Sequence, residues 1–371
     1  MKVIFVATMA AGHIKEFHIP YLKWFREQGW EVHVATYDDV DIPYCDKKHN
    51  IIIQRSPFKL RNVQAYFQLK AIFKNEKYDI IHGHTPMGGI LARLCGKTYR
   101  RNGTKVLYTA HGFHFYQGAP VFNWLVYYPI EKWLSRYTDV LITLNGEDYN
   151  LARTKMKAKD TRYISGIGVD TARFANPTVD RESKRRELGV PLDATVVISV
   201  GELTKRKNHR TAIKAISGIK MDRMNKLYYI ICGEGALKDD LLKLCKDLKI
   251  ENRVFLLGYR NDMEDLLHMA DIFLFPSLQE GLSVALMEAM AAGLPCVVSD
   301  IRGNEDLIEH GRGGFLCGAS NEGEYAMAVA EIAADSHVKH TMGDHNKKII
   351  SEFDLANSMK MMVKIYLMAI S

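Results

Sequence analysis

Residues 280–300 read EGLSVALMEAMAAGLPCVVSD, and they carry the most informative pattern in the chain. It carries one acid in a loop, Glu280, and a second acid, Glu288, on a helix predicted over residues 283–292. A Gly-Leu-Pro turn ends that helix, and a short apolar strand follows at residues 296–299. Another apolar run precedes the first acid. The order strand, loop, helix, strand predicts one repeat of a parallel α/β sheet.

The two acids and the start of the helix form a candidate site for an anion and a sugar. In an open parallel sheet, ligands bind beyond the carboxyl ends of the strands, where helix N-termini point. The amides of Gly281, Leu282 and Ser283 would face an anion there. Glu280 and Glu288 could accept hydrogen bonds from hydroxyls, and acceptors beside a phosphate cradle suit a nucleotide sugar. The alternative is that both acids lie on the exposed face of an amphipathic helix.

Strands alternate with helices along the rest of the chain, which predicts two parallel-sheet domains. The first domain begins with a strand at residues 2–7, and the second restarts with a strand at residues 195–200. Between the two series, residues 166–191 replace periodic apolar residues with Gly, Pro and charged residues, which indicates the hinge. Residues 353–370 read as an apolar-rich helix. Further elements are predicted as strands at residues 31–35, 51–54, 79–82, 105–109, 140–143 and 271–275, a helix near residues 17–28, and a loop at residues 8–13.

The composition is that of a two-domain protein with enough apolar residues for two cores. The chain has 371 residues, of which 47% are apolar, and its six cysteines have no metal-ligand spacing. We therefore expect buried, reduced thiols in a cytoplasmic protein. The first apolar run is too short for a signal peptide, and no run approaches the ~20 apolar residues of a membrane span.

Positive charge is concentrated in the first half of the chain. Residues 1–180 hold 25 Lys and Arg against 16 Asp and Glu, whereas residues 181–371 hold 25 against 27. The excess centres on residues 55–77, where cations alternate with aromatic residues. Such a helix can lie on anionic lipid headgroups, on the inner face of the cytoplasmic membrane; the alternative is a half-buried helix with a solvated basic face. Nucleic acid is not predicted as a partner, because no recognition motif accompanies the basic patch.

Several motifs, in order, resemble those of the family 4 retaining glycosyltransferases. Two Glu followed by a Gly-Leu-Pro turn, within residues 280–296, resemble their donor-site signature. VISVGELTKRKNH (residues 197–209) resembles the Gly-rich strand and loop that end in a donor-phosphate lysine. The other matches are YYIICGEGALKDDL (residues 228–241), VFLLGYRNDMEDLL (residues 254–267) and YTAHGFHF (residues 108–115), which resemble the G-x-G strand, the nucleobase loop and the strand-end histidine at the sugar.

The resemblance covers nearly the whole chain and implies a GT-B fold, in which two Rossmann-like parallel-sheet domains face a central cleft. Residues 1–170 would form the acceptor-side domain and residues 171–352 the donor domain, with residues 353–371 crossing back to the first. It also implies retention at the anomeric carbon. Because no nucleophile stands out in the sequence, we expect the acceptor to attack on the face from which the leaving group departs.

On the donor side, the resemblance implies that Glu288 holds the ribose hydroxyls and that Glu280 holds the sugar hydroxyls. Lys207 would stabilise the departing diphosphate together with the amides that follow Glu280. The remaining donor contacts implied by the motifs are Gly233, Tyr259 and Arg260.

The chain departs from the family pattern beside Lys207. Many relatives carry Arg just after the glycine of this strand, whereas this chain has Glu202. Either Lys205 or Arg206 supplies the second charge, or Lys207 binds phosphate alone.

In the first domain, the resemblance implies a catalytic role for His111 at the end of a strand, where it would contact the donor sugar or help to stabilise charge at the reacting centre. Gly12 would let the backbone approach the diphosphate or the acceptor closely. His114 could equally cap the aromatic run FHFY, and Asn145 with Asp148 three residues on fits a simple helix cap. The acceptor-side candidates are His13, His114 and Asn145, with His18 beside them.

The run DDVD at residues 38–41 invites a metal interpretation. It follows the second strand of the first domain, away from the donor half. Positive side chains and a helix N-terminus would neutralise the leaving diphosphate instead. We therefore expect no cofactor and no essential metal, with Asp39 and Asp41 as solvated loop acids.

Four further stretches resemble bacterial relatives that build exopolysaccharide or capsule repeats: HIPYLKWFREQGWEVHVAT, AHGFHFYQGAP, NWLVYYPIEKWL and TLNGEDY. This resemblance implies a UDP-sugar donor and a lipid-diphosphate-linked glycan acceptor. Two other activities stay open, namely a UDP-N-acetylglucosamine epimerase or hydrolase of the same fold and a non-catalytic nucleotide-sugar sensor. The epimerase or hydrolase would need no acceptor, and a sensor would have no need of a lysine at the leaving group.

Overall fold

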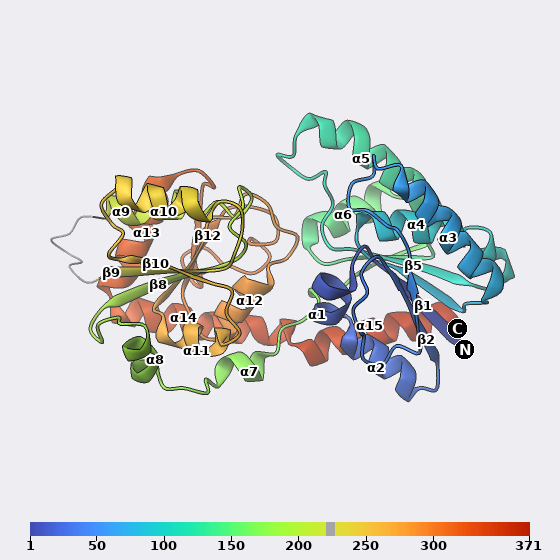
Figure 1. Cartoon of the computed structure of the whole chain (residues 1–371). Coiled ribbons are helices and arrows are strands. Elements are labelled where there is room, and N and C mark those ends of the chain that lie inside the picture. Colours follow the sequence, from blue (N-terminus) through green and yellow to red (C-terminus); the bar gives the residue numbers. More distant parts are fainter. Residues whose placement is uncertain (220–226) are drawn as a thin grey trace. The chain divides into compact units, whose positions relative to one another are not determined.

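The computed structural model describes residues 1–219 and 227–371, which form two compact units (Figure 1). Unit 1 comprises Met1–Ile167 and Ala356–Ser371, and unit 2 comprises Gly168–Leu355. The boundaries predicted from sequence fall after residues 170 and 352. Each unit contains one parallel sheet, so the α/β architecture predicted from the alternation of strands and helices is confirmed.

Unit 1 is built on a seven-stranded parallel sheet with the order β3-β2-β1-β4-β5-β6-β7. Its strands are β1 (Lys2–Val6), β2 (Glu31–Thr36), β3 (Lys47–Asn50), β4 (Ile80–Gly83), β5 (Lys105–Ala110), β6 (Val140–Thr143) and β7 (Asp160–Tyr163). Its helices are η1 (Ala10–Ile14), α1 (Lys15–Phe17), α2 (Ile19–Glu27), α3 (Arg61–Asn75), α4 (Pro86–Gly96), η2 (Tyr99–Asn102), α5 (Val121–Leu134), η3 (Ser135–Tyr137) and α6 (Gly146–Lys155). One face of β1 and β4 packs on α3 and α4 through buried residues such as Ile4, Ile81 and Leu69.

Unit 2 is built on a six-stranded parallel sheet with the order β10-β9-β8-β11-β12-β13. Its strands are β8 (Thr195–Val200), β9 (Leu227–Cys232), β10 (Val254–Gly258), β11 (Ile272–Phe275), β12 (Cys296–Ser299) and β13 (Gly314–Cys317). Its helices are α7 (Thr171–Ala175), α8 (Arg181–Glu187), α9 (His209–Gly218), α10 (Lys238–Asp247), α11 (Met263–Met269), α12 (Val284–Ala291), α13 (Glu322–Ala334), α14 (Ser336–Ile350) and η5 (Ser351–Phe353). The helix and the strand predicted within residues 280–300 are therefore present as α12 and β12.

The last helix, α15 (Leu355–Ile370), belongs to unit 1 for nearly all of its length. Its Tyr366 is fully buried and packs against Phe25 of α2 at 4.7 Å between ring centres. The hydroxyl of Tyr366 lies 2.8 Å from Nδ1 of His82 on β4. The end of the chain thus contributes to the core of the unit in which the chain begins.

Two elements differ from the sequence prediction, and the edge strand β7 was not predicted. Residues 51–54 do not form a strand. The polar residues that precede them form the edge strand β3, and Ile51 and Ile53 are buried in the core. An apolar run of that length indicates burial and does not by itself specify a strand. The predicted loop at residues 8–13 contains the helical turn η1. The edge strand β7 was missed because its sequence, DTRY, has no apolar alternation.

The cysteines and the helices agree with the composition. Five of the six cysteines are buried, Cys45 is half-buried, and all are free thiols. No helix in the described part of the chain has both the length and the apolar character needed to cross a bilayer.

Candidate active site

The predicted donor residues of unit 2 meet at the carboxyl ends of neighbouring strands. Lys207 lies in the loop between β8 and α9, and Glu280 lies in the loop between β11 and α12. Because β8 and β11 are neighbours in the sheet, these two loops emerge side by side. The Lys207 ammonium and the Glu280 carboxylate are 2.8 Å apart.

The Glu280 carboxylate is the centre of this cluster. Its Oε1 accepts hydrogen bonds from Ser277 Oγ at 2.5 Å, Lys207 Nζ at 2.8 Å and Arg206 Nη1 at 2.9 Å. The Glu280 side chain is only 9% exposed. Of the two cations that the sequence analysis considered beside Lys207, Arg206 therefore joins the cluster. Both Arg206 and Lys205 are exposed.

Lys207 is held against the sheet. Its side chain is 11% exposed, and Nζ lies 4.5 Å from the centre of the Phe275 ring. Burial lowers the pKa of Lys207, and the Glu280 carboxylate opposes that shift. An ammonium in this position can exchange its carboxylate partner for an incoming diphosphate, which carries more negative charge.

Two glycines shape the backbone beside Lys207. Gly201 follows β8 with φ of +154°, and a Cβ there would lie 3.1 Å from Cδ and Cε of Lys207. Gly233 follows β9 with φ of +148°, and a Cβ there would lie 2.0 Å from the carbonyl oxygen of Gly201. Gly233 has no room for a side chain, and at Gly201 the Lys207 side chain would have to shift, so the ends of β8 and β9 approach each other as bare backbone.

Glu288 lies on α12, the helix whose first turn is predicted to face the phosphates. Ser283 is the N-cap of this helix, and its Oγ accepts a hydrogen bond from the Leu286 amide at 3.4 Å. The first amides of a helix have no partner within the helix and suit an anion. Glu288 is half-buried. The pKa of Arg173 in α7 is raised, mainly by its hydrogen bond to Glu264 and in addition by the negative charge of Glu288.

The predicted nucleobase loop follows β10. Tyr259 is 73% exposed, so its ring is accessible to a base. The Arg260 guanidinium pairs with Asp262 at 2.6 Å and with Glu187 at 3.4 Å. Arg260 is therefore neutralised by acids of its own unit and would have to leave them to reach a nucleotide.

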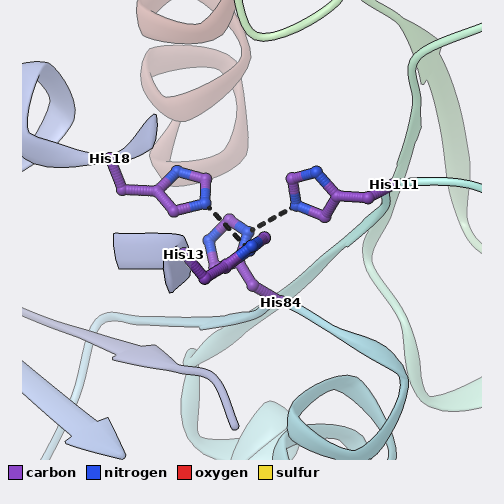
Figure 2. Close-up of side chains that lie close together, drawn as sticks. All are labelled: His13, His18, His84 and His111. Carbon is purple, nitrogen blue, oxygen red and sulfur yellow. Dashed lines mark hydrogen bonds between the residues drawn. The ribbon is translucent and has the colours of Figure 1, made fainter. Parts of the chain in front are cut away.

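Four histidines gather in unit 1 at the carboxyl ends of the adjacent strands β1, β4 and β5 (Figure 2). His111 follows β5, His84 lies just beyond β4, and His13 and His18 lie in the helical segment after β1. The Nε2 atoms of His13 and His18 are 3.2 Å apart, and His111 Nε2 is 3.5 Å from His84 Nδ1. Burial lowers the pKa of all four imidazoles, that of His13 to about 4, so the rings are neutral at pH 7.

His84 was missed by the sequence analysis. It stands just beyond the apolar strand Ile80–Gly83, in the same way as His111 stands just beyond the strand Lys105–Ala110. The criterion that selected His111, a histidine where a buried strand ends, would have selected His84 as well.

Two other predicted residues of unit 1 have structural contacts. Asn145 is fully buried and caps α6, since its Oδ1 accepts from the Asp148 amide at 2.8 Å and its Nδ2 donates to Asp148 Oδ2 at 3.0 Å. Of the two roles open for Asn145, the helix cap is the one that the structure shows. The His114 ring lies 4.8 Å from the Tyr127 ring and lines a cavity of about 350 Å³ with it.

Gly12 lies within η1, where a Cβ would meet nothing within 4 Å. The two preceding amides, of Ala10 and Ala11, donate to the Asp38 carboxylate at 2.6 Å and 2.7 Å. These amides of the first loop therefore already bind an anion of the chain itself. Asp39 is solvated, with its carboxylate 3.7 Å from Lys48 Nζ.

Both units match family models of known proteins. The model described as glycosyl transferases group 1 matches residues 180–349, and the model described as glycosyl transferase 4-like matches residues 2–145. The Bacillus subtilis protein EpsD, named as a glycosyltransferase, is 40% identical over 367 residues, which are 98% of this chain and 96% of EpsD. The UDP-Gal:alpha-D-GlcNAc-diphosphoundecaprenol alpha-1,3-galactosyltransferase of Escherichia coli is 30% identical over 313 residues, 83% of this chain and 80% of that enzyme.

Solved structures show the same fold. Anabaena Alr3699/HepE, in complex with UDP-glucose, superposes with a TM-score of 0.82 at 20% identity over 99% of both chains.

Proposed function

The chain belongs to the group 1, family 4-like glycosyltransferases and has the GT-B fold, and on that premise we propose that it transfers a hexose or N-acetylhexosamine from a UDP-sugar to a lipid-diphosphate-linked glycan. In this proposal the transfer retains the anomeric configuration and serves exopolysaccharide or capsule biosynthesis. The observation that carries it is the carboxylate of Glu280, held by Lys207 and Arg206 at the strand ends beside α12.

The charged cluster has a role at each stage of the proposed reaction. When the nucleotide diphosphate binds, Lys207 and Arg206 exchange the Glu280 carboxylate for phosphate oxygens, which frees Glu280 to accept hydrogen bonds from the sugar hydroxyls. Lys207 and the first amides of α12 then stabilise the charge that develops on the departing UDP. Because these groups supply the positive charge, transfer needs no essential metal. Glu288 holds the ribose hydroxyls, and the role of His111 at the sugar stays a prediction of the family resemblance.

The relatives support the choice of donor and acceptor. The Escherichia coli relative is named for a UDP-galactose donor and a diphosphoundecaprenol-linked acceptor. HepE is solved with UDP and with UDP-glucose.

A donor screen tests the proposal. We expect a UDP-sugar, but not a GDP- or ADP-sugar, to raise the melting temperature of the protein. At a hundredfold excess over Kd the stabilisation is ~2.7 kcal/mol. The shift should be lost in Glu288→Ala and kept in the control Glu331→Ala, which removes an exposed acid of α13. A shift with ADP- or GDP-sugars alone would refute the UDP donor, and turnover of UDP-sugar without acceptor would favour the epimerase or hydrolase.

Retention is tested on the product. The acceptor hydroxyl attacks the face from which UDP departs, so the anomeric proton of the product should show the configuration of the donor by NMR. An inverted anomer would rule out this mechanism.

We also propose that unit 1 makes peripheral contact with the inner face of an anionic membrane, and the exposed side chains of two of its helices support this proposal. Helices α3 and α5 both pack on α4, and α3 presents exposed cations as well. The exposed apolar side chains at these helices are Phe58, Leu60, Val63, Phe67, Val121, Phe122, Leu125, Ile130 and Trp133. Apolar side chains beside Lys and Arg are typical of interfacial binding. We expect the protein to co-sediment with anionic but not with zwitterionic vesicles. The double variant Phe67→Ser with Leu125→Ser should bind these vesicles more weakly, whereas the control Leu242→Ser, at an exposed leucine of unit 2, should bind them as the wild type does. Equal binding by the double variant and the wild type would refute the proposed membrane surface.

A further inference from the structure

The four-histidine cluster of unit 1 has the geometry of a metal site. One ring nitrogen from each of His13, His18, His84 and His111 lies within 4.8 Å of the others. Zinc bonded tetrahedrally to four imidazoles at 2.0–2.1 Å requires the nitrogens to be about 3.3–3.4 Å apart. Two of the contacts, at 3.2 Å and 3.5 Å, already match such an edge. From this arrangement we propose that the four histidines bind a divalent transition-metal ion, for which Zn²⁺ is the best match.

The fold positions these rings before any ligand arrives. His84 is anchored by its amide, which donates to the carbonyl of Val6 at 2.8 Å, and its ring stacks on Phe5 with an interplanar angle of 1°. The ring of His18 lies 4.0 Å from that of His84, between ring centres. Figure 2 shows the four rings converging on one small volume, with His13 and His18 from the segment after β1 and with His84 and His111 from the segments after β4 and β5. Side chains locked by packing in this way lose little entropy when they bind an ion.

The two close contacts in the cluster each join a ring nitrogen to a ring nitrogen, His13 Nε2 to His18 Nε2 and His111 Nε2 to His84 Nδ1. Two neutral imidazoles that meet in this way can share only one proton, whereas a metal ion would engage the lone pairs of both nitrogens.

The chemistry of the ligands selects the class of metal. Neutral imidazole is a ligand for Zn²⁺, Cu²⁺ and Ni²⁺, whereas Mg²⁺ and Ca²⁺ require oxygen ligands, and the cluster contains only imidazoles.

Metal binding would also affect catalysis, and this consequence rests on the proposed function. A ring nitrogen of His111 that binds zinc cannot contact the donor sugar, so zinc is expected to inhibit transfer and a chelator to restore it. Zinc binding itself is measured without any activity assay, so failure of the transferase proposal would leave this test intact.

The experiment uses the full chain without an affinity tag, stripped with a chelator and dialysed. We expect about one Zn²⁺ per chain by elemental analysis after addition of the ion and desalting, and about four nitrogen scatterers near 2.0 Å in the X-ray absorption spectrum at the zinc edge. Addition of Co²⁺ should give the intense visible absorption of a tetrahedral site, and Mg²⁺ should not compete.

Matched variants connect the metal to the cluster. Two variants should each weaken zinc binding at least about 100-fold: His13→Ala, at a half-buried position, and the double variant His18→Gln with His84→Gln. Loss of a residue that only hydrogen-bonds to a metal ligand already lowers metal affinity by up to about 100-fold, and loss of a ligand itself should cost at least as much. The control His337→Ala with His340→Ala removes two exposed histidines of α14 and should bind zinc as the wild type does. Absence of stoichiometric zinc in the wild type, a spectrum dominated by oxygen or sulfur, or equal affinity in His13→Ala would each overturn the proposal. The wild-type spectrum decides the matter even if the double variant does not fold.

Discussion

Truncating Glu280 is the sharpest test of the charged cluster in unit 2. In the wild type one carboxylate oxygen accepts hydrogen bonds from Lys207, Arg206 and Ser277. Glu280→Ala removes that oxygen but leaves the Lys207 ammonium at a position where its side chain is 11% exposed. The Arg206 guanidinium, 44% exposed, can turn to water. The cost therefore comes mainly from Lys207.

The magnitude follows from burial. Breaking one side of a buried ion pair costs about 3–5 kcal/mol because the other charge stays buried without a partner. The Phe275 ring, 4.5 Å from Nζ, keeps part of the stabilisation of the ammonium, and such a contact contributes roughly 1–2 kcal/mol. We therefore expect Glu280→Ala to lower the free energy of unfolding of unit 2 by ~3 kcal/mol. For a domain of this size that lowers Tm by about 6–12 °C.

Differential scanning calorimetry is the assay, since all four tryptophans lie in unit 1 and their fluorescence does not report on unit 2. Adding Lys207→Met to Glu280→Ala should recover a large part of the loss, because it removes the unpaired charge. Glu280→Gln, which keeps an acceptor oxygen, should fall between wild type and Glu280→Ala. A Tm within about 2 °C of wild type for Glu280→Ala, or single-variant losses that simply add in the double variant, would refute this reasoning.

Three further predictions follow from contacts in the two units. Gly233→Ala should destabilise unit 2 by more than about 2 kcal/mol and abolish UDP-sugar binding, since its Cβ would lie 2.0 Å from the Gly201 carbonyl oxygen; Gly218→Ala, whose Cβ meets nothing, should be neutral or stabilising by calorimetry. Arg93→Met should destabilise unit 1 by about 3–5 kcal/mol in a tryptophan-fluorescence melt, because it strands the buried Glu131 that Arg93 binds at 2.7 Å and 3.0 Å; the exposed Arg101→Met is the control, and equal melts would contradict the prediction. Hydrogen bonds from Lys2 and Lys47 lower the pKa of Glu76 from 4.5 to about 2, so the stabilisation by Glu76 is complete above pH 4.5 and disappears as the pH falls towards 2. The difference in unfolding free energy between wild type and Glu76→Gln, measured by urea unfolding, should therefore shrink as the pH falls from 4.5 to 2. A difference that does not change with pH would disprove the assignment.

Much of the fold followed from local sequence signals. Ser283, Gly293 and Pro295 bracket α12 because capping and helix termination are properties of a few adjacent residues. The two errors at the sheet edges have a non-local cause. Ile51 and Ile53 supply an apolar run that is buried without joining the sheet, and the polar DTRY of β7 joins the sheet without an apolar run. Edge strands depend on their neighbours more than on their own composition.

Turn, cap and periodicity signals act over a few residues, and they were sufficient to predict the class of fold and the residue types of the charged cluster in unit 2. Which of those residues meet depends on the tertiary structure. Lys207 and Glu280 are 73 residues apart in the chain, and His111 and His84 are 27 apart. Their contacts depend on the strand order of each sheet, which is fixed when the crossover helices pack and not by any local signal. For the same reason, the four separate histidines of unit 1 become one cluster only in the folded chain.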